Sequence, residues 1–183
     1  CAYVIGTTDG DFPPMGWHIR GEMGGVWAQP IKLLDGYWFA LDGLFLPPAS
    51  RFTTGQGYVQ MEFLTPQGIH VTRTEFAPDG LPAVLVGLTL SSQHARTVRL
   101  SMDVRSDLLA AYPWDWTSPK NTRSFSGQDV SSAENDVLLF RKPDHPWFAL
   151  VALAAGEADI NVNGAFWGTQ DDTAEQGHSE HGH

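Results

Sequence analysis

The sequence has a single cysteine, Cys1, and only three lysines among its 183 residues. One cysteine excludes an intramolecular disulfide and a cysteine-based metal cluster. Two interpretations of Cys1 stay open: the lipidated cysteine of a processed lipoprotein, and the first residue of a fragment. Strand-like residues Ala2–Ile5 follow it directly, where a lipoprotein would have a flexible tether, so the fragment is favoured.

Positive charge is scarce. Eleven Lys and Arg stand against 21 Asp and Glu, which gives a net charge of -10. Nucleic acids and anionic lipids bind to clustered Lys and Arg, so we expect no nucleic-acid partner and no docking on an anionic membrane. The acidic, aromatic-rich composition is typical of a secreted protein with a neutral ligand.

Long apolar runs and cofactor motifs are also missing. No run approaches the ~20 apolar residues of a membrane helix, so we expect no membrane insertion. No signal-peptide pattern occurs, and any export signal would lie upstream of Cys1. Nucleophile-elbow, phosphate-loop and dinucleotide motifs do not occur. Gly21–Gly25 lacks the Lys-Ser or Lys-Thr of a phosphate loop, so these glycines are interpreted as turn residues and we expect no cofactor.

Alternation of apolar and polar residues, which predicts β-strands, is abundant. Four alternating segments follow one another, and Pro66–Gly68 predicts a hairpin turn between the first two. We predict that they form an antiparallel meander, with the most apolar segment as a central strand and with Ile69, Val71 and Phe76 as candidate buried residues. The four segments are Tyr58–Thr65, Ile69–Phe76, Ala83–Leu90 and Arg96–Val104.

Shorter strands are predicted on both sides of this meander, and a helical period occurs only at Ser106–Ala111, before Pro113. We therefore predict an all-β fold, a two-sheet antiparallel β-sandwich of the supersandwich kind with long aromatic loops. The sandwich spans residues 1–168, and the polar, His-rich residues 169–183 form a loop or tail leading to a further domain. The shorter strands are Ala2–Ile5, Tyr37–Leu41, Val137–Phe140, Trp147–Leu153 and Ile160–Val162.

Two aromatic segments, Trp17–Gly43 and Ala111–Pro119, are the candidate binding elements. Aromatic rings beside charged groups suit either a sugar ring or a partner domain, and both interpretations stay open. The charged members would orient sugar hydroxyls or pair across a domain interface. The candidate contact residues are Arg20, Trp27, Trp38, Arg51, Arg105, Asp107, Tyr112, Trp114 and Trp116.

Carboxylates and histidines offer weaker candidates. A glycosidase needs two carboxyl groups at a set separation, and sequence does not define one, so solvated carboxylates or ion-pair partners of arginine are favoured and no catalytic residue is assigned. His178, His181 and His183 could bind zinc, copper or nickel. No frame to preorganise them is evident, so a polar tail is favoured. The candidate carboxylates, which lie in or near the two aromatic segments, are Glu22, Asp35, Asp42, Asp107 and Asp115.

Several of these segments together carry a family resemblance. The sequence GWHIRGEMGGVWAQPIKLLDGYWF (Gly16–Phe39), Ser50–Thr54 and Ser106–Trp114 resemble the N-terminal β-sandwich of secreted bacterial glycogen-debranching-like proteins. These proteins belong with the six-hairpin (α/α-barrel) glycosidases, whose layout is related to that of bacterial glucoamylases. The meander Tyr58–Val104, including Val71–Pro78, is also similar, so the resemblance extends to about Trp167.

The resemblance implies a bacterial protein that is extracellular or on the cell surface. In that family the sandwich packs on a helical-barrel catalytic domain and lends loops to the rim of the sugar cleft. The general acid and base come from the barrel, so no catalytic residue is carried over and the enzyme assignment stays open. We expect a non-catalytic module that contacts the barrel domain, or another chain, and an α-glucan-like polysaccharide. The alternatives are a structural or assembly module without a sugar role, and a small hydrolase built from the loop carboxylates.

Overall fold

The computed structural model describes residues 1–15, 23–110, 129–154, 156, 158–160 and 162, and all regular structure in this part of the chain is β-strand. The predicted all-β, antiparallel, sandwich-like fold is confirmed. The strands are β1 (Ala2–Ile5), β2 (Gly25–Ala28), β3 (Ile31–Leu41), β4 (Leu44–Phe45), β5 (Arg51–Gly55), β6 (Tyr58–Leu64), β7 (His70–Phe76), β8 (Leu85–Ser91), β9 (Leu100–Ala110), β10 (Val130–Glu134), β11 (Val137–Arg141) and β12 (Phe148–Ala152).

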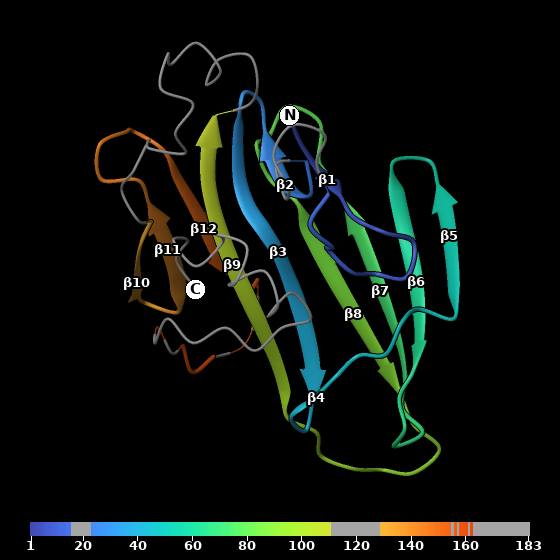
Figure 1. Cartoon of the computed structure of the whole chain (residues 1–183). Coiled ribbons are helices and arrows are strands. Elements are labelled where there is room, and N and C mark those ends of the chain that lie inside the picture. Colours follow the sequence, from blue (N-terminus) through green and yellow to red (C-terminus); the bar gives the residue numbers. More distant parts are fainter. Residues whose placement is uncertain (16–22, 111–128, 155, 157, 161, 163–183) are drawn as a thin grey trace.

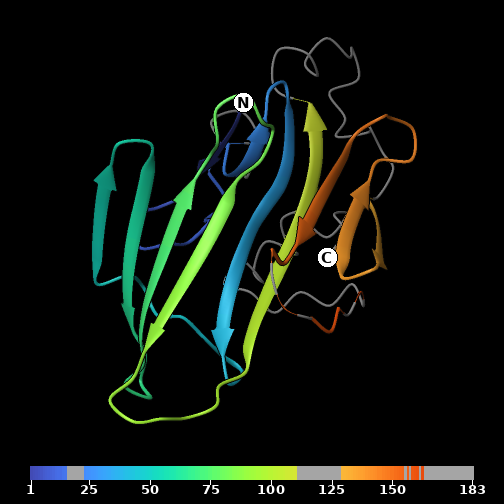
Figure 2. The same cartoon turned by 180° about the vertical axis from the view of Figure 1, so that it is seen from behind.

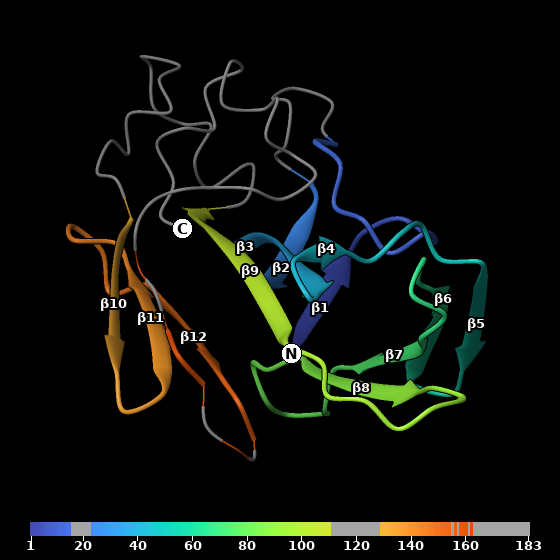
Figure 3. The ribbon, with the colours of Figure 1, turned by 90° about the horizontal axis from the view of Figure 1, so that it is seen from below.

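Hydrogen bonding divides these strands into three antiparallel sheets. The central sheet has the order β1-β2-β3-β4, and β9 pairs with β3 on its other side. Figures 1 and 2 show β3 and β9 side by side, with β5–β8 on one flank and β10–β12 on the other, and Figure 3 shows the same order from below. Both neighbouring sheets pack on β3 and β9, so the consecutive residues 37–41 and 103–108 are all buried. In a sheet with one face in water, buried and exposed residues would alternate along the strand.

The predicted meander is wrong in one member. β6, β7 and β8 pair in the predicted order, but the fourth strand of their sheet is β5, and β9 crosses to β3. β8 is therefore an edge strand and not the predicted central one: Leu85 and Thr89 are exposed, while Val86, Leu88 and Leu90 pack inwards. Alternation defines which residues share a face, but it does not define the partner of a strand across a long connection.

The short helical period predicted at Ser106–Ala111 is also wrong, because β9 continues to Ala110. Two donors near the end of this strand reach one carboxylate: the Oγ of Ser106 lies 2.8 Å, and the amide nitrogen of Leu108 2.9 Å, from Oδ2 of Asp129. Ser106 is also the register partner of Leu34 on β3. These long-range partners override the weak local preference of residues 106–110 for a helix. Ile160 and Val162, predicted to be in a strand, lie outside the strands.

The hairpin predicted between β6 and β7 is confirmed. The amide of Gly68 donates to the carbonyl of Thr65 at 2.9 Å, and the amide of Ile69 donates to the Thr65 hydroxyl at 3.1 Å. Gly68 has a φ of 74°, which disfavours a side chain at that position. Ile69 and Val71 are buried as predicted, but Phe76 faces outwards and is exposed.

Two apolar clusters fill the space between the sheets. The first joins β3 and β9 to both flanking sheets, and the second joins the end of β3 to β6 and β7. Gly36 allows the rings of Trp38 and Phe12 to pack closely in the first cluster. A Cβ at this position would lie only 2.7–2.8 Å from their atoms. The buried members of the first are Phe12, Val26, Leu34, Tyr37, Trp38, Phe39, Val104, Leu108, Phe140 and Ala149. Those of the second are Leu41, Met61, Phe63, Ile69 and Val71.

A buried ion pair lies where β7 meets the central sheet. The Nε of Arg73 is 2.9 Å from Oε1 of Glu75, and the phenol of Tyr37 on β3 donates to the same oxygen at 2.7 Å. The Arg73 guanidinium also donates to the carbonyl of Gly10 at 3.0 Å and lies 5.5 Å from the ring centre of Phe63. A buried charge is tolerated only when it is paired and hydrogen-bonded, and these contacts meet that condition.

Replacing Arg73 with Met should destabilise the fold by about 3–5 kcal/mol, because Glu75 would remain as a buried charge without its cation. The matched control is Arg51→Met, since Arg51 also pairs with a glutamate, Glu62, at 3.7 Å but is 69% exposed. That control should cost no more than about 1 kcal/mol. Denaturant unfolding of both variants measures the difference, and equal costs would contradict a buried role for Arg73–Glu75.

Tyr37 should make the free energy of unfolding decrease at alkaline pH. Burial, followed by the neighbouring Glu75 carboxylate, raises the pKa of the Tyr37 phenol well above its ordinary value. The folded chain therefore holds this proton more tightly than the unfolded chain does. The resulting stability is fully present below about pH 10 and is lost as pH rises through the higher pKa of the folded state.

The free energy of unfolding should fall more steeply above about pH 10 in the natural chain than in Tyr37→Phe, by up to ~1.4 kcal/mol per pH unit. Denaturant unfolding at a series of alkaline pH values measures the two slopes. Tyr58→Phe is the control, because it removes an exposed phenol from β6, in the sheet β5–β8. Parallel curves for the natural chain and Tyr37→Phe would contradict the prediction.

Candidate functional site

The sheet β10–β12 has one face turned to the core and one turned outwards. Its register places Arg141 between Val130 and Phe148, and Leu139 between Ser132 and Leu150. Residues paired in this way share a face of the sheet. The opposite face carries Leu138, Phe140, Ala149 and Val151, which pack in the first apolar cluster. The outward face is rich in apolar residues, since Val130, Phe148 and Leu150 are 44%, 57% and 60% exposed.

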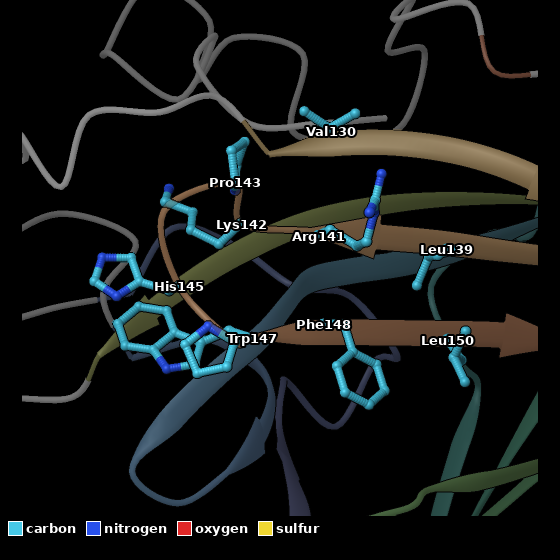
Figure 4. Close-up of a pocket in the computed structure, with 10 residues that line it drawn as sticks. Val130, Leu139, Arg141, Lys142, Pro143, His145, Trp147, Phe148 and Leu150 are labelled. Carbon is cyan, nitrogen blue, oxygen red and sulfur yellow. The ribbon is translucent and has the colours of Figure 1, made fainter.

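This outward face and the loop between β11 and β12 form a groove of about 700 Å³. Figure 4 shows the rings of His145 and Trp147 side by side at one end of the groove, with Phe148 and Leu150 following along β12. The lining residues are Val130, Leu139, Arg141, Lys142, Pro143, His145, Pro146, Trp147, Phe148 and Leu150. The groove thus combines an apolar floor with a few polar groups, which is the usual composition of a ligand site.

The β11–β12 loop fixes the two rings at the end of the groove. The amide of Lys142 donates to the carbonyl of Trp147 at 3.0 Å, and the amide of His145 donates to the carbonyl of Lys142 at 3.2 Å. Pro143 and Pro146 restrict the loop further. The imidazole of His145 and the ring of Trp147 are stacked, with centroids 4.1 Å apart and planes 12° from parallel. A short, closed loop therefore presents a preformed aromatic pair.

Of the two basic residues in the groove, only Arg141 has an exposed side chain. Lys142 is buried, and its Nζ lies 3.2 Å from Oδ1 of Asp129. The other oxygen of Asp129 accepts from Ser106 and from the amide of Leu108 on β9. Asp129 thus connects the loop that carries the groove to the central sheet, and Arg141 is the cation that a ligand could meet.

The predicted contact residues Trp27 and Trp38 lie in the interior. Trp27 is stacked on Tyr3 with a centroid separation of 6.3 Å, and its indole nitrogen donates to the carbonyl of Met23 at 3.1 Å. The indole of Trp38 donates to Asp11 at 2.8 Å, and its ring meets Phe12 edge-on. Both tryptophans are therefore satisfied core residues in the described part of the chain.

The predicted contacts Arg105 and Asp107 lie together in a buried charge cluster with two residues of β3. Nζ of Lys32 is 2.5 Å from Oδ1 of Asp35 and 2.7 Å from Oδ2 of Asp107, and Nε of Arg105 is 3.7 Å from Oδ2 of Asp35. Burial lowers the pKa of the Lys32 amine, but Asp107 and Asp35 raise it more, so this pKa lies above its ordinary value. Of the carboxylates expected to pair with arginine, Asp35 faces Arg105, whereas Asp107 pairs with Lys32.

The remaining predicted residues are dispersed or outside the described ranges. Arg51 is exposed on β5, where it faces Glu62, and it lies apart from the buried charge cluster. Asp42, another candidate carboxylate, forms an ion pair with Arg96 at 3.4 Å. The candidates outside the described residues are Arg20, Glu22, Tyr112, Trp114, Asp115, Trp116, His178, His181 and His183.

Sequence reasoning missed the groove, because Trp147–Leu153 was interpreted only as a strand. The available signal was the alternation of Phe148 and Leu150 on one face, directly after the aromatic and proline-rich His145-Pro-Trp147. In the structure, the opposite face of β12, which carries Ala149 and Val151, packs in the core.

Comparison with protein-family models, with curated proteins and with solved structures gives no match to this chain. Within the described residues, no three His, Cys, Asp or Glu side chains gather into a group that could hold a metal ion. The same part of the chain also contains no helix long and apolar enough to cross a membrane. The groove is consequently the feature of the described residues that bears on function.

Substitutions on the two faces of the sheet β10–β12 should lower the free energy of unfolding by different amounts. Phe140→Ala should destabilise the fold by about 3–5 kcal/mol, because its ring is fully buried between β11 and the central sheet. Phe148→Ala, on the adjacent strand but facing outwards, should change stability by no more than ~0.5 kcal/mol. Thermal or denaturant unfolding compares them. A large cost for Phe148→Ala would show that this face is covered within the chain.

Proposed function

We propose that this chain is a non-catalytic β-sandwich module of an extracellular bacterial carbohydrate-active protein of the glycoside-hydrolase type. In this proposal it packs on a catalytic helical barrel and contacts α-glucan-like polysaccharide through the groove on β10–β12. The observation that carries the proposal is the stacked pair of His145 and Trp147 beside the exposed Arg141. The resemblance of Gly16–Phe39 and Ser106–Trp114 to debranching-like proteins supports the choice of substrate class.

The groove has the features that sugar recognition requires. A pyranose ring presents an apolar C–H face, which packs on an aromatic ring, and hydroxyls at its rim, which need hydrogen-bond partners. Trp147 and Phe148 offer the aromatic surface, and the guanidinium of Arg141 offers several donors in one plane. The loop is held by its own hydrogen bonds and by Asp129, so little ordering is needed on binding.

Calorimetric titration with malto-oligosaccharides tests the proposal. The natural chain should bind, and Trp147→Ala should weaken binding at least about tenfold, or ~1.4 kcal/mol, because the stacking surface is removed. Phe76→Ala is the matched control: Phe76 is also an exposed aromatic residue on a strand, but it belongs to the sheet β5–β8. This control should bind as the natural chain does.

Two results would contradict the proposal at different levels. If the natural chain gives no heat with these sugars, the carbohydrate function fails. If Trp114→Ala abolishes binding while Trp147→Ala does not, sugar binds through the aromatic segment at residues 111–119 and the groove is not the site.

A structural or assembly module is the second candidate function, favoured by the exposed Val130, Phe148 and Leu150 on one sheet face. Such apolar surface commonly marks a protein interface. Concentration-dependent association in sedimentation velocity, without any sugar heat, is the outcome that would favour it.

A further inference from the structure

Lys32 is a primary amine enclosed in the interior of the sandwich. Its side chain has no exposed surface, and its Nζ lies 2.7 Å from Oδ2 of Asp107 and 2.5 Å from Oδ1 of Asp35. Asp107 is on β9, the strand that pairs with β3, so the amine and this carboxyl group come from neighbouring strands of one sheet (Figure 1). Neither the groove nor the proposed sugar contact uses these groups.

The two carboxylates beside Lys32 are not equivalent. Asp35 also faces the guanidinium of Arg105, with Nε 3.7 Å from Oδ2, and a permanent cation favours the ionised form of this carboxyl group. Asp35 lies only three residues from Lys32 on the same strand, whereas Asp107 reaches it from the adjacent strand. Attack on Asp107 would therefore join two strands, and Asp35, which lies beside both Lys32 and Arg105, is placed to accept and return a proton.

We infer that Lys32 and Asp107 condense after folding to form an intramolecular amide bond between β3 and β9, with Asp35 as the proton carrier. This inference is independent of the proposed function, because it concerns a covalent modification of the interior. The resting arrangement is an ion pair, and it becomes reactive when a proton passes from Nζ of Lys32 to Oδ2 of Asp107. Burial by itself favours the neutral amine, but the two carboxylates more than offset it, so the ion pair is the resting form and the neutral amine is the minor, reactive one.

The chemistry is a balanced condensation without any change of oxidation state. The lone pair of Nζ attacks Cγ of Asp107, so that a C–N bond forms and the C–O bond to the protonated oxygen breaks. A proton from Nζ passes to Asp35 and from there to the departing hydroxyl, which leaves as water. One amine and one carboxylic acid thus become one amide and one water molecule, and Asp35 returns to its ionised form.

The surroundings favour this reaction and protect its product. The two strands hold the reacting groups in contact, which replaces a bimolecular encounter with an intramolecular step. Lys32 and Asp107 are both buried, so water that would hydrolyse the amide has little access. The bond would join residues distant in sequence and would restrict the unfolded chain in the way that a disulfide does.

Intact-mass measurement of the natural, denatured chain tests the inference. The expected mass is that of the sequence less one water molecule. Tandem mass spectrometry of a tryptic digest should find the Lys32 and Asp107 peptides joined, with no cleavage after Lys32. Acetylation of the unfolded chain should modify Lys120 and Lys142 but not Lys32. A full sequence mass with Lys32 acetylated would overturn the inference.

Variants identify the reacting groups. Lys32→Arg keeps the positive charge but removes the primary amine, and it should retain the full mass. Asp107→Asn should lose ammonia in place of water, because the leaving group changes, and this outcome would show that residue 107 is the electrophile. Asp35→Asn should fold, as judged by circular dichroism, yet accumulate unlinked chain. Water loss that persists in Lys32→Arg would place the modification elsewhere and contradict the assignment.

Discussion

Coverage of the middle of the β3–β9 pair, at residues 34–41 and 103–108, is the constraint on which the rest of this structure depends. Because the sheets β5–β8 and β10–β12 pack on its two flanks, residues 103–108 of β9 are buried whichever way they point. The sequence nevertheless places Asp103, Arg105 and Asp107 there. A buried charge without a partner costs several kcal/mol, so charges on β3 must complement those on β9. Lys32 meets this requirement for Asp107, and Asp35 meets it for Arg105.

Polar contacts of the same kind connect the outer sheets to the central one. On one side, Tyr37 of β3 donates to Glu75, which is paired with Arg73 on β7. On the other side, Asp129 accepts from Ser106 of β9 and pairs with Lys142 at the base of the β11–β12 loop. Apolar packing tolerates small shifts of one sheet over another, whereas these directional contacts allow only one register. The groove is consequently built on a sheet whose position is fixed.

The sequence could predict what is local. The hairpin at Pro66–Gly68 and the burial of Ile69 and Val71 follow from turn chemistry and alternation over a few residues. The pairing of β9 with β3 could not be predicted in this way, because their partners lie about 70 residues apart and alternation carries no information on strand order. The charged residues of β9 concealed the pairing further, since Arg105 and Asp107 indicated an exposed strand or a site.

The position of an aromatic residue within the sheets decides whether its ring can serve binding. Trp38 lies on an 11-residue strand of the central sheet and packs against Phe12 in the first apolar cluster, so its ring fills the core and its indole nitrogen has a partner in Asp11. Trp147 precedes the first residue of β12, at the end of a hairpin in an outer sheet. There its ring is supported by His145 on one face and by its own loop, while the groove stays open beside it. Counting aromatic residues along the sequence cannot distinguish these two cases. The distinguishing property is the sheet to which the residue belongs. The central sheet is covered by its neighbours, whereas β10–β12 has an outward face, and this places the candidate binding surface at the loop end of β10–β12.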